Sequence, residues 1–99
     1  MKTYEEFLDS LKESSPPKEL STQLLALWYD ANGDWDKAHS YVDGPTDPVS
    51  HWIHAYLHRK EGDMSNADYW YKKADKSRPD IPLDEEWSLI AKQLLSFTQ

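Results

Sequence analysis

The apolar positions of this chain recur at helical spacing. Between Tyr4 and Leu11, and again between Trp87 and Leu94, large apolar residues stand three or four positions apart, as they do on one face of an amphipathic helix. Thr3 and Glu6 form a capping-box pattern directly before the first of these stripes. The pattern predicts an all-α fold.

Turn and cap signals divide the helical segments. Gly33-Asp34 and Gly62-Asp63 each join a residue that tolerates the left-handed conformation to a side chain that caps the next helix. Asp47-Pro48 pairs a cap with a first-turn proline, and Pro16-Pro17 ends one helix and can begin the next. The expected helices span residues 4–13, about 17–32, 35–42, 48–61, 64–76 and 84–97.

An internal repeat relates the middle helices. Placing Gly33 on Gly62 also aligns, without a gap, Ala26 with Ala55, Asp34 with Asp63, Ala38 with Ala67 and Tyr41 with Trp70. Small residues at such positions let two helices approach closely, and the aromatic residue one turn further covers their contact. The sequence therefore predicts two helix-turn-helix units in series.

Residues 51–79 resemble a tetratricopeptide repeat, and the residues that match its pattern are Ala55, Ala67, Tyr71, Ala74 and Pro79. The first copy fits at Leu25, Ala26, Tyr29, Ala38 and Val42, and then departs at 43–48. The resemblance implies one domain over 1–99, built as a right-handed stack of about six helices in antiparallel hairpins. It would comprise a degenerate repeat at about 18–47, a fuller repeat at about 48–81, and flanking helices at 4–13 and 84–97.

Composition narrows the classes of function. The chain has 99 residues, 38% of them hydrophobic, which is enough for one folded domain. A net charge of -7 argues against nucleic acid and anionic membranes as partners, and the absence of cysteine excludes thiol chemistry. Residues 1–13 show neither a signal peptide nor a spanning segment, so we expect a cytoplasmic protein. It could be a monomer or a homodimer.

Four histidines are the residues most suggestive of chemistry. His51, His54 and His58 lie within roughly 60° of one another on a helix. His54 and His58 have a spacing by which helical imidazoles bind Zn²⁺, and His51 or His39 would supply a third ligand. The alternative is that these histidines are core residues, because they occupy positions that tetratricopeptide repeats fill with large side chains. Aspartates or tyrosine hydroxyls would then satisfy their nitrogens.

The resemblance also implies a concave surface formed by the first helix of each hairpin. Its expected ligand-binding residues are Trp52, Tyr56, Arg59, Gln23, Leu27 and Asp30. An aromatic groove with one guanidinium suits a peptide or a partner helix. Alternatively, the terminal helices cover Trp52 and Tyr56, which are then core.

No phosphate-binding glycine loop and no nucleophile motif is present in the sequence. We therefore expect a non-catalytic module that binds a protein or peptide, without a cofactor. The alternative is a small metal- or ligand-binding protein, with Zn²⁺ as the cofactor, centred on the histidines. The exposure of Trp52 and Tyr56, and the bonding of the imidazoles, distinguish the two hypotheses.

Overall fold

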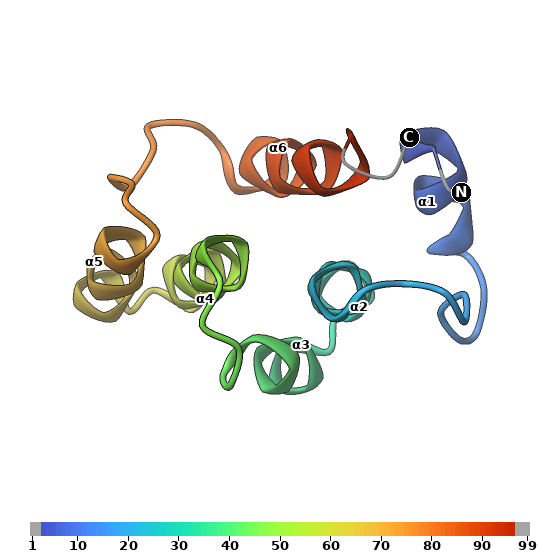
Figure 1. The fold of residues 1–99 in the computed structure, drawn as a ribbon, viewed down its shortest axis with the longest axis horizontal. Coiled ribbons are helices and arrows are strands. Elements are labelled where there is room, and N and C mark those ends of the chain that lie inside the picture. The colour runs from blue at the N-terminus through green and yellow to red at the C-terminus, as the bar shows by residue number, and fades with distance from the viewer. Residues whose placement is uncertain (1–2, 97–99) are drawn as a thin grey trace.

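The computed structural model describes residues 3–96 and is all-helical over that range (Figure 1). This confirms the predicted fold class. The helices are α1 (Tyr4–Ser10), α2 (Thr22–Ala31), α3 (Trp35–Val42), α4 (Pro48–Glu61), α5 (Met64–Lys73) and α6 (Leu83–Ser96). None of the helices within the described range is long and apolar enough to cross a membrane.

Helices α3 and α4 have the predicted bounds, whereas α1, α2 and α5 are shorter than expected. Helix α1 ends early because the Ser10 hydroxyl donates to the carbonyl of Phe7, and the amides that follow bond three residues back instead of four. Helix α2 begins after Ser21, whose hydroxyl accepts from the amide of Leu24. Residue 97, the expected end of the last helix, lies outside the described residues.

The two glycine turns have the same local geometry. Gly33 and Gly62 are left-handed, with φ of 84° and 91°. The amide of the following aspartate, Asp34 or Asp63, bonds 2.9 Å back to the carbonyl five residues earlier, and its side chain caps the next helix. The sequence repeat is therefore matched by a repeat in turn structure.

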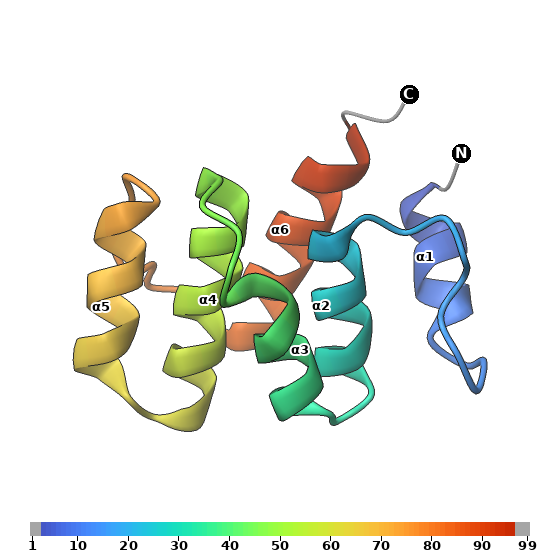
Figure 2. The same ribbon diagram turned by 60° about the horizontal axis from the view of Figure 1, so that its bottom comes forward.

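Helices α2 and α3 pack side by side, as do α4 and α5, and these are the most extensive helix contacts (Figure 2). Helix α6 packs on both α2 and α4, and α1 packs against α6. Leu27, Ile53 and Ile90, from α2, α4 and α6, are fully buried where these helices meet. One face of α4 therefore contacts α6, while α3 and α5 flank its other sides.

Candidate metal centre

The residues expected to form an open peptide groove are buried. Trp52, Tyr56 and Leu27 are only 8%, 2% and 0% exposed, because α6 packs on the surface that α2 and α4 form. Trp87 of α6 donates its indole N–H to the carbonyl of Leu27 at 3.1 Å. Of the two alternatives, the structure therefore has the one in which a terminal helix covers these aromatic residues.

Glu86 of α6 organises the polar groups beneath that helix. Its carboxylate, fully buried, accepts from Trp52 Nε1 at 3.0 Å, Tyr71 Oη at 2.6 Å and Arg59 Nη1 at 2.8 Å. Arg59 also donates to the carbonyl of Ile81. Burial by itself would lower the pKa of Arg59, but the bond and the charge of Glu86 outweigh it and raise that pKa. Arg59 and Trp52 thus have their partners inside the protein.

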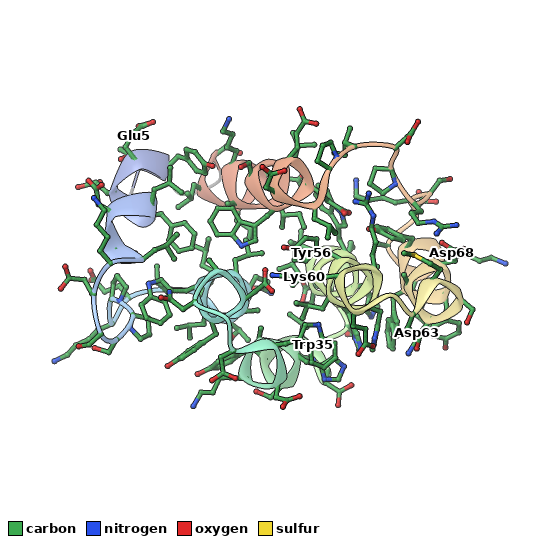
Figure 3. All side chains as sticks on the ribbon, turned by 180° about the vertical axis from the view of Figure 1, so that it is seen from behind. Glu5, Trp35, Tyr56, Lys60, Asp63 and Asp68 are labelled. Atoms are coloured by element: carbon green, nitrogen blue, oxygen red, sulfur yellow. The ribbon has the colours of Figure 1, made fainter. Side chains whose placement is uncertain are left out.

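The remaining residues of the expected groove also have internal partners. Asp30 is buried and accepts from the hydroxyl of Tyr56 at 2.8 Å and from Lys60 at 2.9 Å. Burial, followed by the nearby Asp30 carboxylate, raises the pKa of Tyr56. Gln23 donates to Asp47 and to Ser50. Tyr56 and Lys60 lie on a different side of α4 from Trp35 (Figure 3).

Three of the four histidines meet between α3 and α4. His39 of α3 faces His54 and His58 of α4, and one ring nitrogen from each lies within 4.8 Å of those of the other two. The closest pair is His39 Nε2 and His54 Nε2, at 3.0 Å. His54 is 2% exposed, His58 is 7% exposed and His39 is half-buried. We call these three residues the histidine cluster.

Two indoles enclose the histidine cluster. The ring of Trp35 stacks on that of His39 with centroids 4.9 Å apart, and Trp70 of α5 stacks on His54 at 3.9 Å. Trp35 Nε1 donates to the carbonyl of Leu57 at 2.8 Å, which fixes this indole against α4. The imidazoles of His39 and His54 are therefore stacked on indole rings.

The hydrogen bonding of the histidine cluster is incomplete. Among the buried side-chain nitrogens and oxygens of residues 3–96, His54 Nδ1 alone lacks a hydrogen-bond partner. His58 Nδ1 lies 2.7 Å from a carboxylate oxygen of Glu61. Burial, with repulsion from His39 and then His58, lowers the pKa of His54 to about 4. His54 is therefore neutral at pH 7, which is the form that a metal requires.

His51, the other candidate for third ligand, is not in the cluster. The centroid of its ring lies 5.3 Å from that of Trp70. Although helical periodicity places His51 on the same face of the helix as His54, its ring nitrogens do not join those of the cluster. The aspartates expected as partners for core histidines are also occupied elsewhere, for example Asp68 with Arg78 at 3.2 Å. Sequence reasoning missed Glu61, although its position three residues after His58 places both on one helix face.

The arrangement is close to what a tetrahedral metal site needs. Ligand nitrogens at 2.0–2.1 Å from Zn²⁺ stand about 3.3 Å apart, so the closest pair, at 3.0 Å, is near this spacing and the other pairs must contract by at most about 1.5 Å. The carboxylate of Glu61 fixes Nδ1–H on His58 and leaves Nε2 as a ligand, the second-sphere contact typical of metal-binding histidines. The residues present thus fit a three-imidazole site with a fourth position for water or another ligand.

Comparisons with protein families, with curated proteins and with solved structures found no match.

Proposed function

We propose that this protein binds a divalent transition metal, Zn²⁺ in the first instance, through His39, His54 and His58. The observation that carries the proposal is the convergence of three imidazoles, one ring nitrogen of each lying within 4.8 Å of those of the other two, at a site where His54 is almost completely buried. His39 Nε2 and His54 Nε2 are hydrogen-bonded at 3.0 Å, and a metal between the rings would replace this hydrogen bond. His54, which is neutral at pH 7, needs to lose no proton to become a ligand.

The alternative of purely structural histidines is less well supported. A structural core histidine has both nitrogens bonded, since leaving a buried polar atom unpaired costs about 1–3 kcal/mol. The Glu86 carboxylate shows that this chain can satisfy a buried ionisable group completely. At the histidine cluster one carboxylate, that of Glu61, contacts one of the three rings, that of His58.

Imidazole donors suit Zn²⁺, Cu²⁺ and Ni²⁺. Zn²⁺ is our first choice because it has no geometric preference from its d-electrons and so accepts ligands fixed by helix packing. The ligands come from α3 and α4, the last helix of the first predicted repeat and the first helix of the second. If the helices stack as hairpins in the manner of tetratricopeptide repeats, the metal would join the two repeats, whose contact is smaller than those within each repeat.

A role in binding a peptide or another protein remains a hypothesis. No surface at Trp52, Tyr56 and Arg59 favours it, because α6 covers the first two and Glu86 holds the third. The metal site is therefore the function that the geometry supports best.

The test is a titration of the metal-free protein with Zn²⁺, followed by calorimetry and by tryptophan emission, since Trp35 and Trp70 stack on the cluster. We expect saturable binding of one Zn²⁺ with a micromolar or lower Kd. His54→Phe should weaken binding at least 100-fold, while His51→Ala, which removes a histidine of the same helix outside the cluster, should leave it unchanged. Equal losses in both variants, or no saturable change with the wild-type protein, would refute the proposal.

A further inference from the structure

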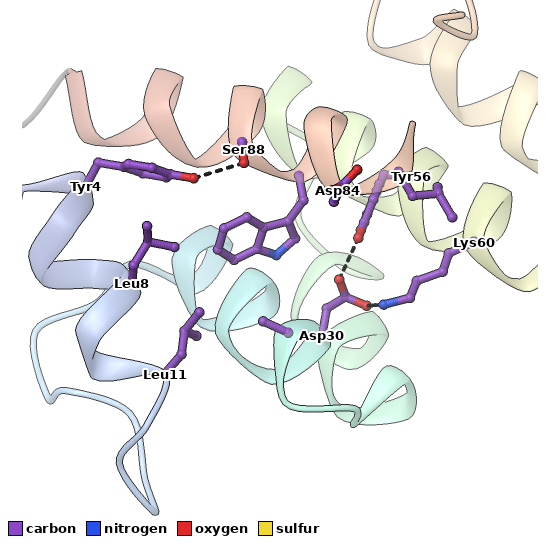
Figure 4. A pocket seen from close by; sticks show the side chains of 11 residues that line it. Tyr4, Leu8, Leu11, Asp30, Tyr56, Lys60, Asp84 and Ser88 are labelled. Atoms are coloured by element: carbon purple, nitrogen blue, oxygen red, sulfur yellow. Dashed lines mark hydrogen bonds and ion pairs between the residues drawn. The ribbon is translucent and has the colours of Figure 1, made fainter. Parts of the chain in front are cut away.

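A cavity of about 410 Å³ opens between α1, α2, α4 and α6, away from the histidine cluster (Figure 4). Leu8 of α1, Leu11 directly after that helix and the indole of Trp87 form an apolar end. Asp30, Lys60 and Asp84 lie at the other end. The volume falls in the range of small-molecule sites, and the separation of apolar from charged groups is typical of sites for amphipathic ligands.

The apolar end is fixed in place. The Tyr4 hydroxyl donates to Ser88 Oγ at 2.9 Å, which joins α1 to α6, and Phe7 stacks on Trp87 with ring centroids 5.8 Å apart. The Trp87 N–H is already bonded to a carbonyl of α2, so the ring offers its apolar surface to the cavity. Leu8, at 37% exposed, is one of the few large apolar side chains left in contact with water. A ligand at this end would remove apolar surface from water without a rearrangement of the walls.

The charged end carries one uncompensated charge. Lys60 and Asp30 neutralise each other at 2.9 Å, and the second oxygen of Asp30 accepts from Tyr56. Asp84, in the first turn of α6, is exposed and forms no ion pair with any residue of the described range. The net charge at this end is therefore negative, in a protein whose overall charge is -7.

We propose that this cavity binds a hydrophobic amine, with an aromatic or aliphatic body against Trp87 and Leu8 and a protonated nitrogen near Asp84. The charge of Asp84 selects a cation over an anion. Tyr4 and Tyr56 also line the cavity, and aromatic rings attract cations, as the ammonium of Lys92 shows by lying 5.0 Å from the centroid of the Tyr4 ring. This site shares no residue with the histidine cluster, so it stands independently of the proposed metal function.

The test uses three indoles that differ in their charge: tryptamine, neutral 3-methylindole and anionic indole-3-acetate. Chemical-shift titration of the ¹⁵N-labelled, metal-free protein is suitable because fragments of this size bind with Kd values on the order of a millimolar. We expect tryptamine to bind tightest and to shift the amides of α1 and of the first turn of α6. EDTA throughout keeps the result separate from metal binding.

Two variants on the same turn of α6 decide the role of charge. Asp84→Asn should weaken tryptamine about three- to fivefold, the usual effect of an exposed ion pair, and leave 3-methylindole unchanged. Glu85→Gln removes a neighbouring exposed carboxylate that does not line the cavity, and should change tryptamine binding by less than about 1.5-fold in 0.15 M salt. Equal effects of both variants would overturn the proposal. So would tighter binding of indole-3-acetate, which would indicate an anion site at Lys60, or no saturable shift with any of the three.

Discussion

Two buried polar clusters contact α4, and they differ in how completely their hydrogen bonds are formed. The Glu86 carboxylate receives three donors, one of them the guanidinium of Arg59. The histidine cluster brings together three bases of the same kind and leaves His54 Nδ1 unpaired. Glu86 and His54 are both almost inaccessible to water, so burial does not distinguish these two residues.

One cluster is a carboxylate with three donors from the protein, and the other is a set of imidazoles that face one another, for which we propose a ligand. A buried charge is tolerated where donors surround it, and Glu86 is of this kind. Of the three imidazoles, His58 has the carboxylate of Glu61 as a partner, whereas His39 and His54 are bonded to each other, and a cation between the rings would make this arrangement more favourable. The predictions below test this difference.

The largest effect is expected from Glu86→Ala. Removal of the carboxylate leaves Arg59, Tyr71 and Trp52 with unpaired buried donors, and we expect the free energy of unfolding to fall by about 3–5 kcal/mol. Urea denaturation measures this loss. Glu85→Ala, one residue earlier and exposed, is the matched control and should change stability by less than about 0.5 kcal/mol. A loss below 1 kcal/mol for Glu86→Ala would show that its bonds are not structural.

The next effect is on the pH dependence of stability. The pKa of His54 is about 4 in the folded protein, below the ordinary value of 6.5, so the unfolded chain binds this proton more readily. The contribution of His54 to the free energy of unfolding is complete above pH 6.5. This contribution falls by about 3 kcal/mol as the pH falls toward 4. Urea titrations of the metal-free protein across this window should show the decline, and the difference between wild type and His54→Phe isolates it from titrating carboxylates. Parallel curves for the two proteins would contradict the assignment.

A smaller effect is expected for the carboxylate that faces His58. Glu61→Gln leaves an acceptor near His58 Nδ1 but removes its charge, and Zn²⁺ affinity should fall about tenfold, or about 1.4 kcal/mol. Competition with a chromophoric chelator measures this change. Asp63→Asn, which alters the neighbouring cap of α5, is the control for loss of local negative charge. An equal loss of Zn²⁺ affinity in the control would show that Glu61 acts only through its negative charge and not through its contact with His58.

The smallest effect is on the stability of the metal-free protein at pH 7.5. His54→Phe replaces an incompletely bonded ring with an apolar ring that can still stack on Trp70, so we expect stability within about 1 kcal/mol of wild type, or an increase. Thermal unfolding in EDTA measures it. A loss comparable to that of Glu86→Ala would mean that the two clusters do not differ in the way described.

Much of the local structure could be predicted from the sequence because its signals are local. Asp34, Asp47-Pro48 and Gly62 fix helix ends within a few residues of chain, and the bounds of α3 and α4 followed from them. The burial of Glu86 could not be predicted from local signals. Glu86 looks like its neighbours Asp84 and Glu85, acids in a first helical turn, yet it is fully buried, because its environment depends on how α6 lies on α2 and α4.

The candidate site was predictable in part for the same reason. Periodicity places His54 and His58 on one face of a helix, but it also places His51 there, and choosing His39 as the third ligand requires the contact of α3 with α4. The expected groove depended on the helix order of a resembled family. That order gave no information on where α6 lies. Because α6 covers Trp52 and Tyr56, the expected groove is not open.

The central claim is that the histidine cluster binds metal, and anomalous diffraction tests it most directly. Crystals grown with one equivalent of Zn²⁺ should be measured on both sides of the zinc edge. We predict an anomalous peak between His39, His54 and His58, about 2.0–2.1 Å from one nitrogen of each ring. A peak only at exposed carboxylates, or a cluster that keeps its 3.0 Å contact between His39 and His54 with no peak beside it, would contradict the account.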